Sequence, residues 1–154
     1  MQILNKKARL NYKILETFEA GLALTGPEVK SIRDGQVSLD GSHVQLSRLP
    51  AAGGWRLAAT LVGLHTSPYL PAAPSDGATD PARPKKLLLH RDEILNISAK
   101  ARSQNCTVIP LRLYDKHGII KVEIALAKGK KKWEKKETLK QRDINREIRR
   151  VVSR

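Results

Sequence analysis

Positive charge is concentrated at the C-terminal end of this 154-residue chain, and this limits which part of it can fold around a core. Residues 128–154 contain twelve Lys and Arg against four Asp and Glu, a net charge of +8 out of +14 for the whole chain. A length of 154 residues fits one domain with an appendage better than two domains. We therefore predict one folded body, residues 1–129, followed by a basic C-terminal arm, residues 130–154.

The arm has the pattern of an amphipathic helix whose basic face opposes its own folding. Aliphatic and basic side chains gather on opposite sides of a helical wheel. Several arginines follow one another four residues apart, where like charges repel, and an isolated helix of this kind is marginal in water. We predict an arm that is disordered when free and helical when bound to a polyanion. The alternative is a solvated tail that only keeps the protein soluble. The aliphatic residues are Ile144, Ile148, Val151 and Val152, and the basic ones are Arg142, Arg146, Arg149 and Arg150.

The net charge of +14 and a pI near 10.2 indicate a polyanionic partner, nucleic acid first and an anionic membrane surface second. Four aliphatic residues on the arm are thin support for membrane binding, and the most apolar stretch, residues 57–64, is too short to span a bilayer. We therefore expect no membrane partner. The single Cys106 excludes an internal disulfide, and Lys6 and Lys7 precede any apolar run that could form a secretory signal. Both features favour the cytoplasm.

The sequence contains no motif of a catalytic or metal centre. The four histidines are well separated and have no zinc-site spacing, and neither a GxSxG turn nor a Walker loop is present. We expect no catalytic residue, no metal and no cofactor. A nuclease or another RNA-processing enzyme stays an alternative, because catalytic groups are recognised by geometry rather than by their order in the sequence.

Alternating apolar patterns and turn residues predict a mainly β body. Residues 86–89 form a short apolar run. Thr25 with Glu28 forms a capping box at the start of a short helix that ends at Asp34-Gly35. Hairpin connections between short strands favour a small antiparallel OB-like β-barrel of about six strands with two or three helices. We expect strands at 12–20, 43–49, 55–64, 107–114 and 119–127, a second helix at 91–103 and a loop at 66–84.

A series of short motifs also runs in order over nearly the whole chain. They are Asn5-Lys6-Lys7-Ala8-Arg9 with Tyr12, Phe18-Glu19-Ala20-Gly21, the segments 28–35, 67–69 and 80–90, Ile109-Pro110-Leu111 with Tyr114, and Leu126-Ala127-Lys128-Gly129-Lys130-Lys131. Together they resemble the small protein B family, the SsrA-binding proteins that partner tmRNA in bacterial ribosome rescue.

This resemblance implies a function for each part of the chain. The body would bind the tRNA-like domain of tmRNA near its elbow. The arm would enter the empty mRNA channel of a stalled ribosome, at the small-subunit decoding centre, and contact ribosomal RNA there. Elongation factor Tu would be an indirect partner through aminoacylated tmRNA, and a monomer is expected. The main rival is a general or ribosomal RNA-binding protein whose tail is electrostatic glue.

The resemblance carries family RNA-contact positions over to Asn5, Glu19 and Leu88. A carboxylate such as Glu19 meets RNA favourably only where it accepts from a base amino group or a 2′-hydroxyl, and its alternative is a solvent-facing carboxylate or a salt bridge to a nearby Lys. The alternative for Leu88 is a buried position in the hydrophobic core. We expect phosphate contacts from Lys6, Lys7 and Arg9 around Asn5, whose alternative is a solvated terminus, and from Arg83, Lys85 and Lys86, whose alternative is solvated loop charge.

The arm departs from the family pattern at three places. Glu134-Lys135-Lys136 stands where the family usually has Asp-Lys-Arg, which leaves point charges in place of a bidentate guanidinium. Many members have a Trp where this chain has Ile144, and Trp133 replaces a more usual Tyr or His just upstream. Stacking on ribosomal bases would then depend on Trp133. The alternative for Trp133 is packing against the barrel. The expected ribosome contacts are Lys130, Lys131, Trp133, Glu134, Lys135, Lys136, Arg142, Ile144, Arg146, Arg149 and Arg150.

Overall fold

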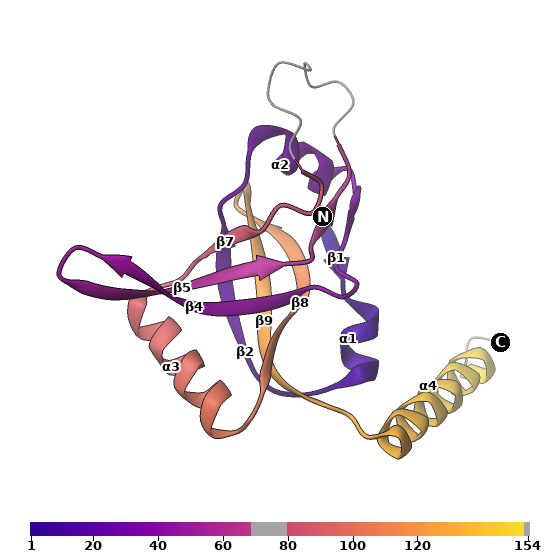
Figure 1. Ribbon diagram of the computed structural model, residues 1–154. Helices are drawn as coiled ribbons and strands as arrows, with labels where there is room; N and C mark the ends of the chain where they lie inside the picture. The colour runs from indigo at the N-terminus through magenta and orange to yellow at the C-terminus, as the bar shows by residue number, and fades with distance from the viewer. Residues whose placement is uncertain (69–79, 153–154) are drawn as a thin grey trace.

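The computed structural model describes residues 1–68 and 80–152, and it contains a closed antiparallel barrel (Figure 1). Six strands follow one another around the ring in the order β8-β4-β5-β7-β2-β9, and pairing between β8 and β9 closes it. Two of the joints are short, because β4 meets β8 only at Val44 opposite Val108 and β5 meets β7 only at Thr60 and Leu61, so the rest of the β4–β5 hairpin extends beyond the ring. The predicted small β-barrel of about six strands is confirmed. The strands are β2 (Tyr12–Leu22), β4 (His43–Ala51), β5 (Gly54–Val62), β7 (Lys85–Leu88), β8 (Thr107–Lys116) and β9 (Ile119–Gly129).

Both predicted hairpins are present. β4 and β5 pair from His43 opposite Val62 to Ala51 opposite Gly54. β8 and β9 are joined by His117 and Gly118, which both have positive φ, the backbone of the tight turn that matches strand twist. β4, β8 and β9 extend two residues past their predicted ends, to Ala51, Lys116 and Gly129, whereas β5 ends at Val62, two residues before its predicted end.

The core is almost entirely aliphatic, as the low aromatic content of the sequence requires. Leu61, Leu113 and Val122 are fully buried inside the barrel. β8 and β9 also bury their other face in places, where a second cluster forms around Ile109 and Ala125. That second cluster includes Ala8 of helix α1 (Lys6–Asn11), so this short helix covers the outside of the barrel.

Helices α2 (Gly26–Arg33) and α3 (Arg91–Ser103) confirm the two helices predicted for the body. The capping box is formed as expected: Thr25 Oγ1 accepts from the Glu28 N–H at 3.4 Å, and Glu28 Oε1 accepts from the Thr25 N–H at 3.0 Å. α3 buries Ile94 and Ile97 against the barrel.

Some elements are absent from the sequence-based prediction. β1 (Gln2–Leu4) adds to β8, and β3 (Val37–Ser38) pairs with β6 (His65–Thr66) in a separate two-stranded sheet. α1 is also new; it is only six residues long and buries only Ala8, so it has no readable apolar period. Of the expected loop at 66–84, residues 69–79 lie outside the described residues, as do residues 153–154 of the arm.

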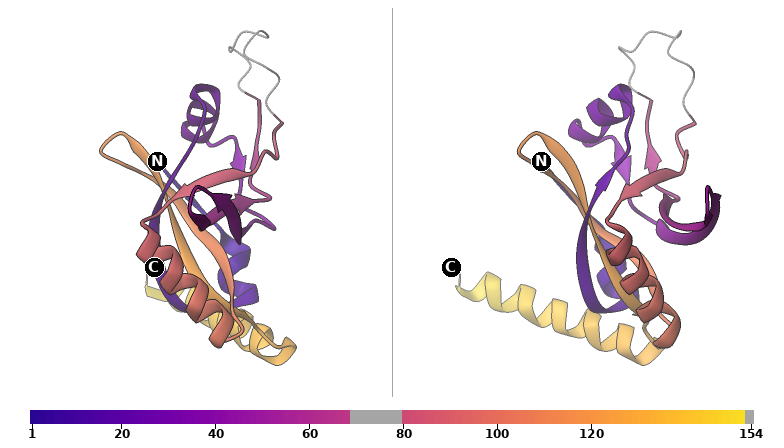
Figure 2. Two further views of the ribbon diagram at one scale, coloured as in Figure 1. Left: turned by 60° about the vertical axis from the view of Figure 1, so that its left-hand side comes forward. Right: turned by 90° about the vertical axis from the view of Figure 1, so that its left-hand side faces the viewer.

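The arm forms helix α4 (Lys132–Val152), which projects from the foot of the barrel in every view (Figures 1 and 2). None of its described side chains is buried. This is the conformation expected for the bound arm, and the disorder expected for the free arm stays a prediction. Among the described residues, no helix is both long and apolar enough to cross a membrane.

Candidate nucleic-acid interface

Glu19 lies at the centre of a hydrogen-bonded cluster on the outer face of β2, β8 and β9. Its carboxylate accepts a hydrogen bond from the Tyr114 hydroxyl and lies 3.4 Å from Lys116 Nζ and 3.5 Å from Lys121 Nζ. The alternative prediction for Glu19, a salt bridge to a nearby Lys, is therefore confirmed. Two neighbouring ammonium groups also reduce the repulsion between this carboxylate and a phosphate.

The same contacts shift two pKa values in opposite directions. The hydrogen bond from Tyr114, followed by the charges of Lys116 and Lys121, lowers the pKa of Glu19. Burial, with the hydrogen bond to Glu19, raises the pKa of Tyr114 to about 12. The pair therefore consists of a carboxylate and a neutral phenol throughout the physiological pH range.

Arg112 holds the other side of Tyr114. Its guanidinium carbon lies 4.7 Å from the centre of the Tyr114 ring, and its Nε lies 2.5 Å from the Glu123 carboxylate. The hydrogen bond to Glu123 raises the pKa of Arg112. These contacts fix the phenol in the orientation in which it donates to Glu19.

Leu88 is exposed, not buried, so the core position given as its alternative is wrong. Leu87 is 2% exposed and Leu88 is 54% exposed, because successive side chains of a strand point to opposite faces. Leu88 pairs with Gly21 of β2. Its side chain covers that glycine and presents apolar surface to solvent.

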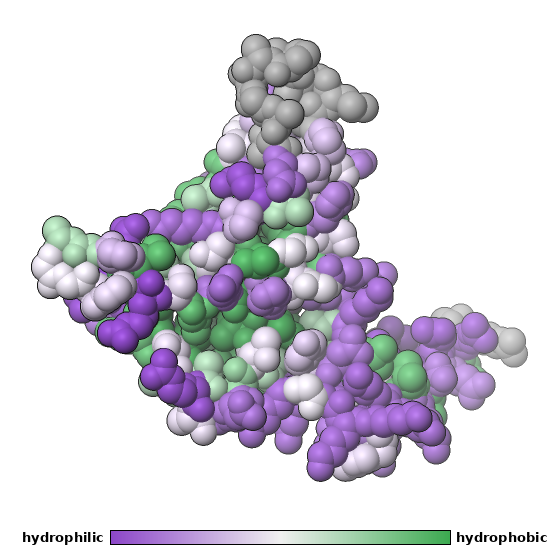
Figure 3. Space-filling model, in the orientation of Figure 1, coloured by the Kyte–Doolittle hydropathy of each residue, from purple (hydrophilic) through white to green (hydrophobic). Residues whose placement is uncertain are grey.

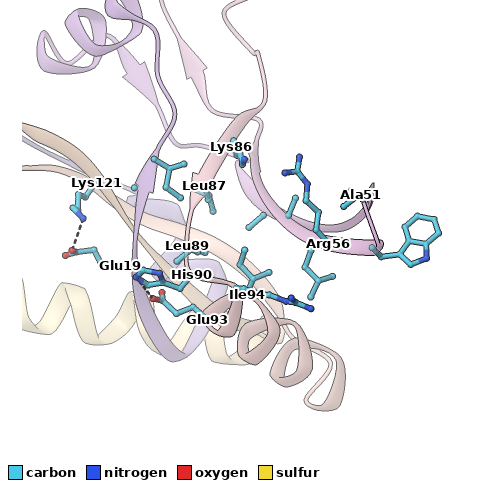
Figure 4. Close-up of a pocket in the computed structure, with 18 residues that line it drawn as sticks. Glu19, Ala51, Arg56, Lys86, Leu87, Leu89, His90, Glu93, Ile94 and Lys121 are labelled. Carbon is cyan, nitrogen blue, oxygen red and sulfur yellow. Dashed lines mark ion pairs between the residues drawn. The ribbon is translucent and has the colours of Figure 1, made fainter.

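Glu19 and Leu88 line one open groove of about 790 Å³ (Figure 4). Glu19 and Lys121 come from β2 and β9, Lys86 and Leu87 from β7, and Arg56 from the β4–β5 hairpin. α3 contributes the remaining wall, including Arg91. Figure 3 shows apolar surface at the centre of this face with hydrophilic side chains around it. The groove thus combines an apolar floor with cationic margins, which suits a nucleic-acid segment with bases inward and phosphates at the rim.

Lys85 is not a phosphate ligand in this structure, contrary to the prediction. Its side chain is fully buried; Nζ donates to the Arg83 carbonyl at 2.9 Å and lies 3.3 Å from Glu28 Oε2. Burial, against the attraction of Glu28, lowers the pKa of Lys85. Arg83 is also engaged, because its guanidinium lies 2.6 Å from Glu28 Oε1. Of the three predicted cations, Lys86 is the one that lines the groove.

Asn5 is buried and structural. Its Oδ1 accepts from the Ala8 N–H at 3.2 Å and caps α1, and its Nδ2 donates to the Pro110 carbonyl at 2.9 Å. Lys6, Lys7 and Arg9 are exposed on the helix that Asn5 caps, and Lys7 pairs with Asp40 at 3.4 Å. The alternative prediction for these three cations was an irregular solvated terminus. The structure has an ordered helix there, with the cations on its exposed surface.

The two predicted parts of the body site do not share one pocket. Asn5 and Lys7 line a separate hollow of about 410 Å³. No residue of that hollow also lines the groove that contains Glu19 and Leu88. A ligand that uses both must extend across the barrel surface, as a large folded RNA does.

The arm starts from a fixed junction with α1. The Lys130 N–H donates to the Asn11 carbonyl at 2.8 Å. Lys130 Nζ donates to the Arg9 carbonyl at 3.1 Å and to Thr138 Oγ1 at 2.7 Å. Glu134 accepts from the Lys131 N–H at 3.2 Å and so caps the N-terminus of α4.

The remaining predicted arm residues are on the surface of α4, apart from Lys131, which directly precedes it. Trp133 is 58% exposed, so the alternative prediction that its ring packs against the barrel is wrong. The others are accessible in the same way, with Glu134 and Lys135 partly covered: Lys131, Lys136, Arg142, Ile144, Arg146, Arg149 and Arg150.

The sequence reasoning missed Arg56, Arg91 and Lys121 in the groove. Their positions depend on how the hairpin, α3 and β9 meet, and no local pattern indicates that. For Arg91, the only local signal is that it begins a helix directly after the strand containing Leu88. Within the described residues, no three His, Cys, Asp or Glu side chains come together as metal ligands.

Comparison with known proteins gives consistent results. The family described as "SmpB protein" matches residues 2–154. An SsrA-binding protein of Sulfurihydrogenibium sp. (strain YO3AOP1) is 48% identical over 144 residues, which is 94% of this chain and 88% of that protein. An SsrA-binding protein of Trichodesmium erythraeum is 44% identical over 148 residues, 96% of this chain and 89% of that protein. A solved chain from "tmRNA-SmpB: a journey to the center of the bacterial ribosome" superimposes with a TM-score of 0.64 at 36% identity, covering 90% of this chain and 94% of that one.

Proposed function

Because this chain belongs to the SmpB protein family, we propose that it binds tmRNA and acts with it on the ribosome in trans-translation. The barrel binds the tRNA-like domain of tmRNA near its elbow, and the C-terminal arm probes the empty mRNA channel of a stalled ribosome. The role is one of binding, without catalysis. The names of the relatives and the ribosomal setting of the solved chain support this proposal.

The observation that carries the proposal is the separation of two basic surfaces on one chain. The groove with Glu19 and Leu88 is lined by the β4–β5 hairpin, the barrel strands and α3. Helix α4 instead leaves from the α1 junction at the foot of the barrel (Figure 1). Two separate surfaces allow the protein to hold one RNA and test another site at the same time.

The dimensions of the arm suit a probe. Its 21 residues in helical form span about 30 Å. The helix is cationic and lacks buried side chains, so little barrel packing opposes its insertion between phosphates. The positive end groups of Lys135, Lys136, Arg142 and Arg146 would neutralise ribosomal RNA, and the exposed Trp133 ring would stack on a base.

Further expectations accompany this function. The protein acts as a monomer in the cytoplasm, and elongation factor Tu meets it indirectly through aminoacylated tmRNA. The rival hypothesis is a general RNA-binding protein whose arm only adds attraction for phosphates. The two hypotheses predict different specificity for the tRNA-like domain over other RNAs.

The test is a competition between RNAs at fixed salt. A labelled tRNA-like domain of tmRNA is bound by the full chain and challenged with an unlabelled RNA hairpin of equal length. Specific binding predicts displacement by the unlabelled tRNA-like domain at a concentration at least a hundredfold lower than by the hairpin. Equal displacement contradicts the proposal. Both affinities should fall with salt, with a log–log slope of about −0.7 to −0.9 per neutralised phosphate.

A further inference from the structure

A second groove, of about 420 Å³, lies beside the groove of Glu19 and Leu88 on the side of the β4–β5 hairpin. Its walls are the tip of that hairpin and the outer face of α3. Its lining residues are Arg48, Trp55, Arg56, Leu57, Arg91, Leu95, Ser98, Ala99 and Arg102. We refer to it as the arginine groove. None of the predicted site residues lines it.

Local geometry places these side chains together. Arg48 pairs with Leu57 across the hairpin, so Trp55, two residues earlier on β5, is the diagonal neighbour of Arg48 on the same face. The α3 residues of the groove lie at spacings of three and four, which is one face of a helix. Arg91 and Arg102 stand at opposite ends of that face.

The arginine groove is lined by four cations and no carboxylate. Within residues 1–68 and 80–152, Arg48, Arg56, Arg91 and Arg102 make no ion pair with an acidic side chain. Four unneutralised guanidinium groups repel one another across a small hollow, so an anion that enters relieves this repulsion. Guanidinium groups also present paired donors that fit phosphate oxygens.

Trp55 adds an aromatic surface to this charge. It is 62% exposed, and the Arg48 guanidinium carbon lies 5.9 Å from the centre of its ring. An exposed indole beside unpaired arginines has the composition of a platform for an unpaired base, in which the ring stacks on the base and the arginines hold the flanking phosphates. An acidic protein segment would use the same charges but has no need of the ring.

We propose that the arginine groove binds an unpaired segment of RNA, with one base stacked on Trp55 and its phosphates held by Arg56, Arg91 and Arg102. Trp55, Arg56, Leu57 and Arg91 line both grooves, so the two form one continuous surface. The occupant is therefore an unpaired nucleotide segment that continues from the RNA held over Leu88. This inference rests on the proposed binding of the tRNA-like domain and extends that site.

Trp55 itself reports on occupancy. Replacing the other tryptophan (Trp133→Phe) leaves Trp55 as the single indole of the chain. Titration with a ten-nucleotide oligoadenylate should quench its fluorescence saturably. In the same background, Arg91→Gln with Arg102→Gln should weaken this binding about tenfold, whereas Lys13→Gln with Lys128→Gln, an equal loss of charge on β2 and β9, should change it less than threefold. Unchanged Trp55 fluorescence overturns the proposal, and so does equal quenching by a ten-residue polyglutamate peptide.

Binding of the tRNA-like domain separates this inference from the function on which it rests. Trp55→Ala should weaken binding about tenfold and Trp55→Phe less than threefold, because phenylalanine keeps a stacking surface. If the unsubstituted protein binds the tRNA-like domain and both variants bind equally well, the arginine groove is not part of the site. If the unsubstituted protein binds oligoadenylate through Trp55 but not the tRNA-like domain, the groove stands and the proposed function fails.

Discussion

Leu88 of β7 lies directly over Gly21 of β2, and a Cβ atom at Gly21 would come within 3.2 Å of the Leu88 Cβ. The glycine therefore sets the position of the exposed leucine in the groove. Its role here is the close approach of two strands, because its φ is not in the left-handed region.

Gly21→Ala should cost about 1–3 kcal/mol of stability, because the nearest atom, the Leu88 Cβ, moves outward only with the backbone of β7. The same movement displaces the apolar surface of the groove, so the affinity for the tRNA-like domain should fall about tenfold. Gly26→Ala is the matched control, since no atom lies within 4 Å of its new Cβ. Urea denaturation and a binding titration measure the two effects, and equal affinity of both variants would contradict the role given to Gly21.

The buried Lys85 predicts an asymmetry between two substitutions. Glu28→Gln replaces the capping carboxylate oxygen of α2 with an amide oxygen that can still accept, but it leaves the buried ammonium without its countercharge. This should cost about 3–5 kcal/mol of the free energy of unfolding. Lys85→Met removes that charge and leaves Glu28 paired with Arg83, so it should cost clearly less. Chemical denaturation of both variants measures the difference, and the reverse order of stability would refute this reading.

Neutralising Lys85 should also leave RNA binding nearly intact. Lys85→Met should bind the tRNA-like domain within threefold of the unsubstituted protein, while Lys86→Met, at the exposed neighbouring position, should bind several-fold less tightly. Filter binding at one salt concentration compares them. A larger loss of affinity for Lys85→Met than for Lys86→Met would indicate that Lys85 contacts the RNA.

The Glu19–Tyr114 pair predicts a pH dependence on the acid side. The pKa of Glu19 is lower in the folded protein than its ordinary value of 4.5, so its contribution to stability is complete above that value and is lost as the pH falls through the folded pKa. Tyr114→Phe removes the largest cause of the shift. An NMR titration of the Glu19 carboxyl carbon should then show a higher pKa, and an unchanged pKa would contradict the hydrogen bond.

Tyr114 has the opposite behaviour at high pH. Its pKa is raised to about 12 in the folded protein, so its contribution is present below the ordinary value of 10.0 and is lost as the pH rises through about 12. Stability should therefore decline in this alkaline range, and the decline should be smaller in Tyr114→Phe.

Much of the body can be read from local sequence signals. Thr25 and Glu28 carry their capping box within four residues, and His117-Gly118 marks the turn of a hairpin. α1 could not be predicted because it depends on contacts that are distant in sequence, the hydrogen bond from Asn5 Nδ2 to the Pro110 carbonyl and the packing of Ala8 on β8 and β9.

The site was less accessible to prediction than the fold. The run Lys85-Lys86-Leu87-Leu88 does not show which residues face inward, and the strand register decides that Lys85 and Leu87 do. Glu19 and Tyr114 are 95 residues apart, so no local sequence pattern predicts their hydrogen bond. Trp55 and Arg91 become neighbours only when the hairpin meets α3.

The central claim, that the body binds tmRNA while the arm acts on the ribosome, is tested most directly by removing residues 130–154. The truncated protein should bind the tRNA-like domain within about threefold of the full chain and should lose peptide tagging on stalled ribosomes. A chain that keeps the arm but has Trp55→Ala should instead bind tmRNA more weakly. If truncation reduces tmRNA binding to the level of an unrelated RNA hairpin, the body is not the specific reader and the account is wrong.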